Sequence, residues 1–347
     1  FILFWILMVI DYIDIIPYEK KIFSQLRNSK HIYTSKKGFY VKLISGNYNG
    51  FGEISILEGF SKESLKEVSW AFEVLRLGFP LKEKIDLDEL LDYIHIQTEN
   101  FPSLRFGFET AIYDIYCQIK KTSLSSYFSK KNHNPIFLST IYNNNNNRYQ
   151  NFDTIKLKIG FNSLDEDIKI MRKINSFKKM KFRLDANQAL SVDDIIKIEK
   201  ATKDFDIEYL EEPLSDLTIE NLRIIKKNTN FKIAIDETIY TDKNWKEFLY
   251  TGMINYLIIK PSIFGGFKDF FEIVNFANNN KVEIILSSSI ETHIGHFACL
   301  HLASSLNSKT RHGLDYFAFY TDSENIFFNQ NDCKIKLDKI IGLGTKL

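Results

Sequence analysis

Cysteine and proline are scarce in this chain, and neither sign of charge is in excess. The three cysteines among its 347 residues, Cys117, Cys299 and Cys333, lie far apart and form no C-x-x-C pair. This pattern indicates neither a disulfide framework nor a thiolate zinc site, and it fits a reducing, cytoplasmic environment. The 45 Lys and Arg against 44 Asp and Glu leave a net charge of +1. Such a balance provides no basic field for capturing nucleic acid or an anionic membrane.

Long hydrophobic runs are also missing. The apolar start covers residues 1–10, whereas about 20 residues are needed to cross a bilayer. Asp11 and Asp14 follow it, with no basic flank and no small-residue cleavage site, so it is typical of neither a signal peptide nor a membrane anchor. We expect Met8 to begin an edge strand and residues 1–7 to lie upstream of the natural start.

The chain is long enough for about two domains, and the pattern of apolar and polar segments changes along its length. The first third mixes a hairpin, expected over 40–56, with helices. These helices are expected over 61–77, with Ser61 as N-cap, and over 103–121. From about residue 135, short apolar runs alternate with polar helices, which indicates parallel βαβ units that close into a TIM-like barrel without an exposed sheet edge. The eight runs are 135–140, 154–159, 182–185, 207–211, 232–236, 256–260, 282–287 and 311–313.

Charged and polar residues recur at the ends of the apolar runs. A barrel places its active site there, because the loops that follow the strands open at one face. Successive positions are 24 to 27 residues apart, which is one βα repeat. A single such residue is usually a helix cap or a solvated rim residue, but a set with this spacing is expected to surround one pocket. The set is Lys158, Asp185, Glu211, Asp236, Lys260 and Ser287.

Three carboxylates of this set come from adjacent strands. Asp185, Glu211 and Asp236 would crowd like charges, which cannot all stay ionised without a counter-charge. They therefore predict a hard divalent cation, and an oxygen-only ligand set suits Mg²⁺, with Mn²⁺ as a substitute. Lys158 and Lys260 lie four strands apart of eight, so we expect them to face each other across this metal.

This arrangement predicts proton abstraction beside a carboxylate. The cation would bind the carboxylate of a small-molecule substrate and stabilise the negative charge that forms when the α-proton leaves. A neutral lysine would take that proton, and the nearby positive charges would lower its pKa. Lys156 lies two residues before Lys158 on the same strand face and adds a further positive charge.

Weaker signals lie beyond the seventh run. The segment Ser287-Ser-Ser-Ile-Glu291 offers hydroxyl and backbone N–H groups to an anionic part of a substrate, although serine clusters are also common helix caps. His293 and His296 lack the H-E-x-x-H spacing of a zinc site. No G-x-S-x-G elbow is present, so a serine hydrolase is not indicated.

Together these motifs resemble the muconate-lactonising subgroup of the enolase superfamily and, within it, the o-succinylbenzoate synthases of menaquinone biosynthesis. The likeness spans most of the chain. In the barrel it is carried by Lys156-Leu-Lys158, Arg183-Leu-Asp-Ala-Asn187, Glu211-Glu-Pro213, Asp236-Glu-Thr238, Lys260-Pro-Ser-Ile-Phe-Gly-Gly266 and Ser287-Ser-Ser-Ile-Glu-Thr292. Elsewhere it is carried by Gly52-Glu-Ile-Ser55, Gly59-Phe-Ser61, Pro102-Ser-Leu-Arg-Phe-Gly-Phe-Glu109 and His312-Gly-Leu-Asp315.

The resemblance implies a (β/α)₇β barrel over residues 126–320. An α+β capping domain would close it, formed by residues 1–125 together with a returning C-terminal segment, 321–347. Two departures lie in the capping region, which shapes substrate specificity in this family. Glu58 stands where members usually carry proline, and residues 23–32 replace a glycine-containing loop.

For the site, the resemblance implies a Mg²⁺-dependent syn-dehydration of 2-succinyl-6-hydroxy-2,4-cyclohexadiene-1-carboxylate to 2-succinylbenzoate. Lys158 would remove the α-proton and deliver it to the departing hydroxyl. Lys260 would stay cationic beside the enediolate, and Lys156 would tune Lys158. The implied metal ligands are Asp185, Glu211 and Asp236, and the implied substrate-binding residues are Ser287, Ser288, Gly313 and Arg183.

Other activities stay open. Dipeptide epimerases of the same subgroup tend to carry Asp-x-Asp after the eighth strand to bind the substrate ammonium, and the matching stretch here, Gly313-Leu-Asp315, has one Asp. N-acylamino acid racemases share nearly every catalytic residue with the synthases. From other classes, the barrel could be a Schiff-base aldolase that uses a rim lysine, or a non-catalytic barrel that binds an anion. A homo-oligomer is compatible with all of these.

Overall fold

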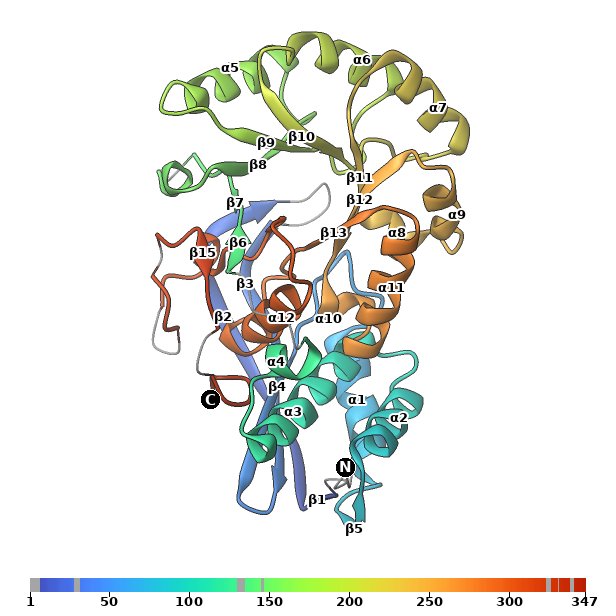
Figure 1. Ribbon diagram of the computed structural model, residues 1–347, viewed down its shortest axis with the longest axis vertical. Helices are drawn as coiled ribbons and strands as arrows, with labels where there is room; N and C mark the ends of the chain where they lie inside the picture. Colours follow the sequence, from blue (N-terminus) through green and yellow to red (C-terminus); the bar gives the residue numbers. More distant parts are fainter. Residues whose placement is uncertain are drawn as a thin grey trace.

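The computed structural model places a capping region below a barrel (Figure 1). It describes residues 7–27, 32–129, 135–144, 147–322, 326–329, 331–337 and 340–347, with the backbone alone for 24–27, 32–33 and 82. The stretch expected to precede the natural start lies outside the described residues, apart from Leu7. Within the described ranges, no helix has the length and apolar character that crossing a bilayer requires. All three cysteines are free thiols.

The capping region is built on an antiparallel sheet in the order β2-β3-β4, and the predicted hairpin is confirmed as β3 and β4. The helix predicted over 103–121 is confirmed as α3, which packs on β4. A Cβ added to Gly52 would lie 1.8 Å from the carbonyl oxygen of Gly107, so glycine at these positions lets the two backbones touch. The elements are β1 (Met8–Ile10), β2 (Tyr12–Arg27), β3 (Ile32–Ser45), β4 (Tyr48–Ile54), α1 (Leu65–Arg76), β5 (Leu81–Ile85), α2 (Leu87–Gln97), α3 (Pro102–Lys120) and α4 (Leu124–Phe128).

The predicted start of the helix over 61–77 was wrong, because the N-cap of α1 is Ser64 and not Ser61. Ser64 and Glu67 form a capping box in which Ser64 Oγ accepts from the backbone N–H of Glu67 at 3.3 Å, and the Glu67 carboxylate accepts from that of Ser64 at 2.8 Å. This reciprocal pair satisfies two backbone donors at once. Ser61 Oγ instead accepts from the backbone N–H of Leu57 at 3.0 Å in the preceding turn.

All eight apolar runs of the second region are strands, and the TIM-like barrel is confirmed. Strands β7 to β13 form one parallel sheet in chain order. β14 pairs in parallel with β6, and Gly313 bridges to Ser287 at the end of β13. The run predicted as one strand over 135–140 is divided into β6 and β7 at Ser139, and β14 closes the ring. The strands are β6 (Ile136–Leu138), β7 (Thr140–Ile141), β8 (Thr154–Lys158), β9 (Lys181–Asp185), β10 (Asp206–Glu211), β11 (Ile233–Ile235), β12 (Ile254–Ile259), β13 (Glu283–Leu286) and β14 (Arg311–His312).

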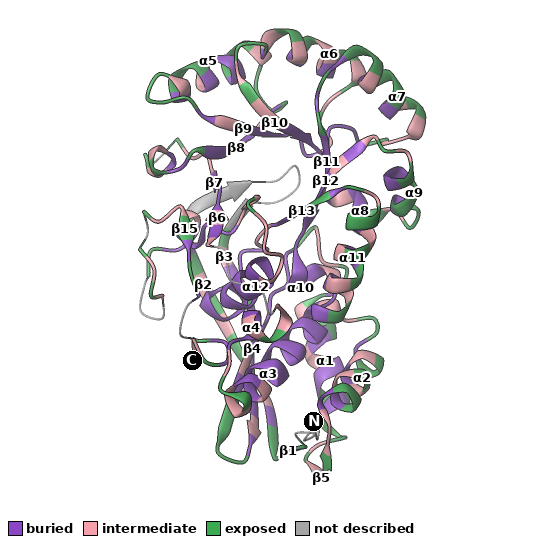
Figure 2. Ribbon diagram, in the orientation of Figure 1, coloured by how far each residue is buried: buried purple, intermediate pink, exposed green. Residues whose placement is uncertain are grey.

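Helices surround the barrel on two sides with different degrees of burial. Helices α5 to α7 form an outer arc and keep exposed faces, whereas α12 lies against the capping region and is buried nearly all round (Figures 1 and 2). Its surroundings explain why α12 lacks a polar stripe. The helices are α5 (Leu164–Asn175), α6 (Val192–Ala201), α7 (Ile219–Asn228), α8 (Glu237–Thr241), α9 (Trp245–Tyr250), α10 (Pro261–Phe264), α11 (Phe267–Asn279) and α12 (His293–Ser305), with 3₁₀ turns η1 (Arg148–Asn151) and η2 (Tyr316–Ala318).

The C-terminal segment contacts both regions. β15 (Lys334–Ile335) pairs antiparallel with β6 of the barrel. Further on, the backbone N–H of Leu343 donates to Asp114 Oδ1 of α3 at 2.8 Å. The domain boundaries at residues 125 and 320 stay a prediction.

Candidate active site

Four of the predicted catalytic and metal-binding residues lie on three neighbouring barrel strands. Lys156 and Lys158 are on β8, and Asp185 and Glu211 are the last residues of β9 and β10. Across the parallel sheet, Lys158 pairs with Asp185, and Asp185 pairs with Glu211. The repeat spacing therefore brings their side chains to one level at the carboxyl end of the barrel.

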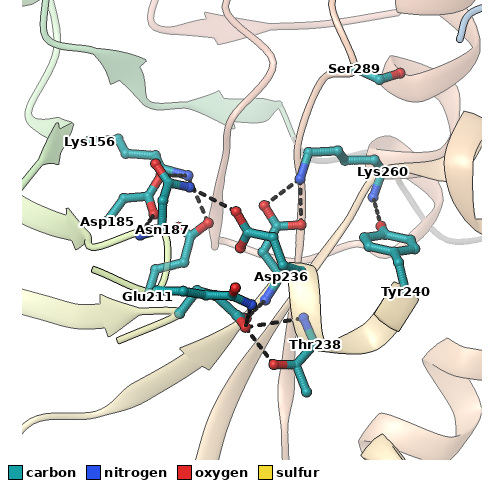
Figure 3. A network of polar contacts seen from close by, with 12 residues as sticks. Lys156, Asp185, Asn187, Glu211, Asp236, Thr238, Tyr240, Lys260 and Ser289 are labelled. Atoms are coloured by element: carbon teal, nitrogen blue, oxygen red, sulfur yellow. Dashed lines mark hydrogen bonds and ion pairs between the residues drawn. The ribbon is translucent and has the colours of Figure 1, made fainter. Parts of the chain in front are cut away.

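Ammonium groups lie beside all three carboxylates of the predicted metal site (Figure 3). Lys156 Nζ is 2.8 Å from Asp185 Oδ2 and 2.7 Å from Glu211 Oε1. Lys260, which follows β12, contacts both carboxylate oxygens of Asp236, which follows β11. As the side chains stand, no group of three Asp, Glu, His or Cys in the described ranges is placed to hold a metal ion. Two lysines thus supply part of the counter-charge that we expected from a divalent ion.

Three buried oxygen atoms beside these carboxylates have no hydrogen-bond partner among the described residues. They are Glu211 Oε2, Asn187 Oδ1 and Glu237 Oε2. Asn187 and Glu237 also contact each other, with Asn187 Nδ2 donating to Glu237 Oε1 at 2.8 Å. A buried acceptor without a partner costs about 1–3 kcal/mol, and oxygen atoms are the donors that Mg²⁺ prefers. The residues present therefore fit a hard divalent cation, for which Asp185, Glu211 and Asp236 are the candidate ligands.

The backbone that follows β9 and β10 adopts an uncommon conformation. Asn187, Gln188 and Glu212 have φ angles of 41°, 68° and 42°, a region that residues other than glycine rarely adopt and that is often found at functional sites. The buried Glu212 carboxylate accepts from the backbone N–H of Asp236 at 2.8 Å and of Thr238 at 3.1 Å. It fixes the backbone that carries Asp236. Sequence reasoning missed Asn187 and Glu212 as site residues, although both lie inside the motifs that carry the family resemblance.

The two lysines of β8 have different electrostatic surroundings. Burial would lower the pKa of Lys156, but Asp185 and Glu211 outweigh it and hold this pKa well above its usual value. Burial lowers the pKa of Lys158; Asp185 opposes this effect and Lys156 adds to it, so the net direction is downward. A lysine with a lowered pKa loses its proton more readily, which a general base requires. Lys158 is therefore the better candidate for the base.

A narrow cavity of about 40 Å³ lies inside the barrel beside these groups. As the side chains stand, it has room for a few water molecules. A substrate can therefore enter only if some of the lining side chains move. The lining of the cavity includes the ion pair of Lys156 and Glu211. It also includes all four predicted substrate-binding residues: Ser287, Ser288, Gly313 and Arg183.

The predicted substrate-binding residues at the end of β13 differ in what their polar groups already contact. Ser288 Oγ donates to Glu291 Oε2 at 2.6 Å and accepts from the backbone N–H of Ile290 at 2.8 Å, so this hydroxyl holds its own loop. Gly313 faces Ser287, and a Cβ added to it would lie 3.4 Å from Ser287 Oγ. Gly313 thus leaves space beside the Ser287 hydroxyl.

Arg183 is mostly committed to contacts inside the barrel. It is 1% exposed, and its Nε donates to Glu208 Oε2 at 2.6 Å and its Nη1 to Ser139 Oγ at 3.0 Å. Its guanidinium also lies over the ring of Tyr209, 5.1 Å from the centroid. Nη2 has no hydrogen-bond partner among the described residues. Any contact of Arg183 with a substrate is therefore expected through Nη2.

The fold and the site define a class of protein: a TIM-like barrel with amine and carboxylate side chains at the carboxyl ends of its strands. Residues 144–347 match the family model described as Enolase C-terminal domain-like. Because this match covers more than half of the chain, the chain belongs to that family.

Curated relatives carry two different activities. A hydrophobic dipeptide epimerase from Enterococcus faecalis is 32% identical over 168 residues, which are 47% of this chain and 47% of that relative. An L-Ala-D/L-Glu epimerase from Francisella tularensis subsp. novicida is 24% identical over 95% of this chain and 96% of its own. An o-succinylbenzoate synthase from Desulfotalea psychrophila is 22% identical over 85% and 90%. These relatives do not decide between epimerase and synthase.

Solved structures confirm the fold. The L-Ala-D/L-Glu epimerase from Bacillus subtilis superposes with a TM-score of 0.85 at 22% identity, over 97% of this chain and 99% of its own. The dipeptide epimerase from Enterococcus faecalis, complexed with Mg and the dipeptide L-Leu-L-Tyr, gives 0.84 at 21% identity with the same coverage. At these identities the likeness shows the fold alone.

Proposed function

We propose that this chain is a Mg²⁺-dependent o-succinylbenzoate synthase of menaquinone biosynthesis. It would dehydrate 2-succinyl-6-hydroxy-2,4-cyclohexadiene-1-carboxylate to 2-succinylbenzoate. A synthase of this name is among the relatives that align over most of the chain. The lysines and carboxylates at the barrel end are the groups that this elimination needs.

In this proposal Lys158 is both the base and the proton donor. Its Nζ takes the proton from the ring carbon that bears the carboxylate; then the C–O bond to the ring hydroxyl breaks, and the same proton leaves with the hydroxide as water. The lowered pKa of Lys158 supports this role. Lys260 is 5% exposed and supplies a fixed positive charge beside Asp236. Mg²⁺, when bound, would stabilise negative charge on the substrate carboxylate.

The observation that favours the synthase over a dipeptide epimerase is the state of Asp315. This carboxylate is 4% exposed and accepts from Thr140 Oγ1 at 2.6 Å, from Arg148 Nε at 2.9 Å and from Arg148 Nη2. Epimerases of the subgroup tend to use two Asp at this place to bind a substrate ammonium. Here Gly313 replaces one of them, and Arg148 neutralises the other. A substrate ammonium would have to displace Arg148 from a buried, charge-assisted contact.

The second candidate is a dipeptide epimerase. The 32% identity to the Enterococcus faecalis enzyme over 47% of the chain favours it. It would use Lys158 and Lys260 on opposite faces of one α-carbon, without loss of water. An N-acylamino acid racemase would do the same with a substrate that has no ammonium group, so the Asp315 contact does not count against it.

One set of incubations separates these activities. The purified protein is given Mg²⁺ and the cyclohexadiene carboxylate, and aromatic-ring absorbance is followed. Parallel samples in D₂O contain L-Ala-L-Glu, L-Leu-L-Tyr or an N-succinyl amino acid, and NMR follows exchange of the α-proton. We expect ring formation and no exchange in the dipeptides. Dipeptide exchange without ring formation would establish the epimerase, and the Lys158→Ala variant controls for a contaminating enzyme.

A further inference from the structure

A buried lysine of the capping region reaches the loop that follows β13. Lys36 lies on β3 and is 3% exposed. Its Nζ donates to the backbone carbonyl of Ile56 at 2.6 Å and to that of Ser289 at 2.8 Å. Ser289 is 253 residues away in the sequence and lies next to Ser287 and Ser288, which line the cavity of the candidate site. One ammonium group thus joins three segments at the boundary between the capping region and the barrel.

The loop that Lys36 contacts is a hydrogen-bonded unit. The carboxylate of Glu291 accepts from Ser288 Oγ at 2.6 Å, from the backbone N–H of Ser289 at 2.9 Å and from Ser262 Oγ at 2.9 Å. Ser262 belongs to α10, directly after Lys260 and Pro261. The loop is therefore tied to the chain that carries Lys260, and Lys36 contacts it from the capping side.

The same loop contains a residue in a disfavoured conformation. Ile290 has a φ of 64°, which is unusual for a β-branched residue and persists only where the surroundings impose it. The carbonyl of Ile290 accepts from Tyr320 Oη at 2.9 Å. Contacts on both sides of Ile290, from Tyr320 and from Lys36 through Ser289, oppose relaxation of this backbone.

The charge of Lys36 strengthens its two contacts. Hydrogen bonds from an ammonium group are roughly twice as strong as those between neutral groups. The acids that face it are Glu291 from the loop, Glu53 from β4 and Glu58 from the segment after β4. Burial outweighs these acids and lowers the pKa of Lys36 to about 8. Its charge is therefore present at neutral pH and is lost as the pH rises through about 8.

We propose that Lys36 is a positioning residue, whose ammonium holds residues 287–290 in the shape that receives the second carboxylate of the substrate. This rests on the proposed function, in which Ser287 and Gly313 line the end of the pocket for the succinyl arm. Lys36 itself does not touch the reacting atoms. Loss of the Lys36 ammonium leaves the proton transfer intact and weakens binding of the succinyl group of the substrate.

Lys36→Met, which keeps an unbranched side chain of nearly the same length and removes the ammonium group, tests this against Lys37→Met. Lys37 is the next residue on the strand, with a side chain 57% exposed. Calorimetry with Mg²⁺ measures binding of 2-succinylbenzoate and of benzoate, which lacks the arm. In Lys36→Met we expect about tenfold weaker binding of 2-succinylbenzoate, unchanged binding of benzoate and Mg²⁺, and a rise in KM larger than the fall in kcat. In Lys37→Met we expect no change. Equal affinity of Lys36→Met and wild type for 2-succinylbenzoate overturns the proposal.

The wild-type protein provides a readout that does not depend on folding of a variant. Its affinity for 2-succinylbenzoate is expected to fall between pH 7 and 9.5, whereas Lys36→Arg, which stays charged, keeps its affinity over this range. An affinity of the wild type that is constant over this range contradicts the role of the Lys36 charge.

A third measurement needs no ligand. Hydrogen exchange of the backbone amides of residues 288–290 should become at least tenfold faster in Lys36→Met, with α5 unchanged as the internal reference. If the wild type binds no 2-succinylbenzoate, the proposed function fails, and this exchange measurement still decides the positioning role. Unchanged exchange in the loop overturns it.

Discussion

Charged groups are buried in two parts of this molecule, and they are neutralised differently. At the barrel end, carboxylates meet ammonium groups, as in the contact of Lys156 with Asp185 at 2.8 Å. At the boundary between the capping region and the barrel, buried charges contact backbone groups and hydroxyl groups instead. Glu53 accepts from the backbone N–H of Thr292 at 2.9 Å and of Gly295 at 2.8 Å.

This difference in contacts indicates which of the two sites can exchange its present hydrogen-bond partners for a ligand. Two side chains that form an ion pair can both rotate away and accept a ligand instead. Backbone donors cannot turn without moving the chain, so a carboxylate held by them is fixed with the fold. We therefore expect changes at the barrel end to affect the chemical step, and changes at the boundary to affect stability and, at Lys36, the affinity for the substrate.

The largest effect is expected from Lys158→Ala. Turnover should fall by the roughly 10²–10⁴-fold that a general base contributes, because no proton acceptor remains at that place on β8. The transition temperature should stay within a few degrees of the wild type. Ring-absorbance assays and calorimetry measure the two quantities, and Lys173→Ala on the exposed face of α5 is the matched control. Near-wild-type turnover would remove Lys158 from the mechanism.

At the boundary between the capping region and the barrel, Glu53→Ala should instead lower the stability of the protein and leave the metal site intact. It leaves buried donors of Tyr18, Thr292 and Gly295 without an acceptor, and each orphaned donor costs about 1–3 kcal/mol. We expect the free energy of unfolding in urea to fall by about 3 kcal/mol or more, with Mg²⁺ affinity unchanged in the folded protein. Glu19→Ala, at an exposed pair with Lys37, is the control. If Glu53→Ala lowers the free energy of unfolding no more than Glu19→Ala does, the contrast between the barrel end and the boundary is wrong.

A smaller effect is expected from Asp236→Asn. It removes a candidate ligand charge, and we expect Mg²⁺ to bind at least about 10–100-fold more weakly, the range seen for outer-shell changes. Titration calorimetry measures the affinity, and the exposed Asp216→Asn serves as control. If Asp236→Asn binds Mg²⁺ as the wild type does, the assigned ligand set is wrong.

The smallest effect concerns pH. Glu109 of α3 is buried against α11, where it accepts from the backbone N–H of Phe267 at 2.5 Å, and burial raises its pKa to about 7. The folded state therefore holds this proton where the unfolded state has lost it. Stability is highest below the unfolded pKa and should fall by roughly 1–2 kcal/mol as the pH rises from 5 to 7. Urea unfolding at several pH values tests this, and Glu109→Gln should flatten the curve. A wild-type profile that is equally flat would exclude this carboxyl as the source.

Local patterns in the sequence were sufficient for features that lie within one element or one repeat. The spacing from Lys158 to Asp185 to Glu211 predicts a shared level at the barrel end, because equal repeats bring successive strand ends into register. The error at Ser61 arose because two serines three residues apart, Ser61 and Ser64, both satisfy the N-cap preference. Only the reciprocal contact with Glu67 selects Ser64.

The sequence by itself determined the strand order of the barrel and the chemical types gathered at its end, since both follow from periodicity and residue identity. The tertiary structure alone decided which partners the charged groups contact: Lys36 contacts the carbonyl of Ser289, and Arg148 contacts Asp315. These partners lie 253 and 167 residues apart, and their contact depends on how distant segments of the chain pack. No local preference of the chain encodes that packing, because helix, strand and turn signals act over a few residues only.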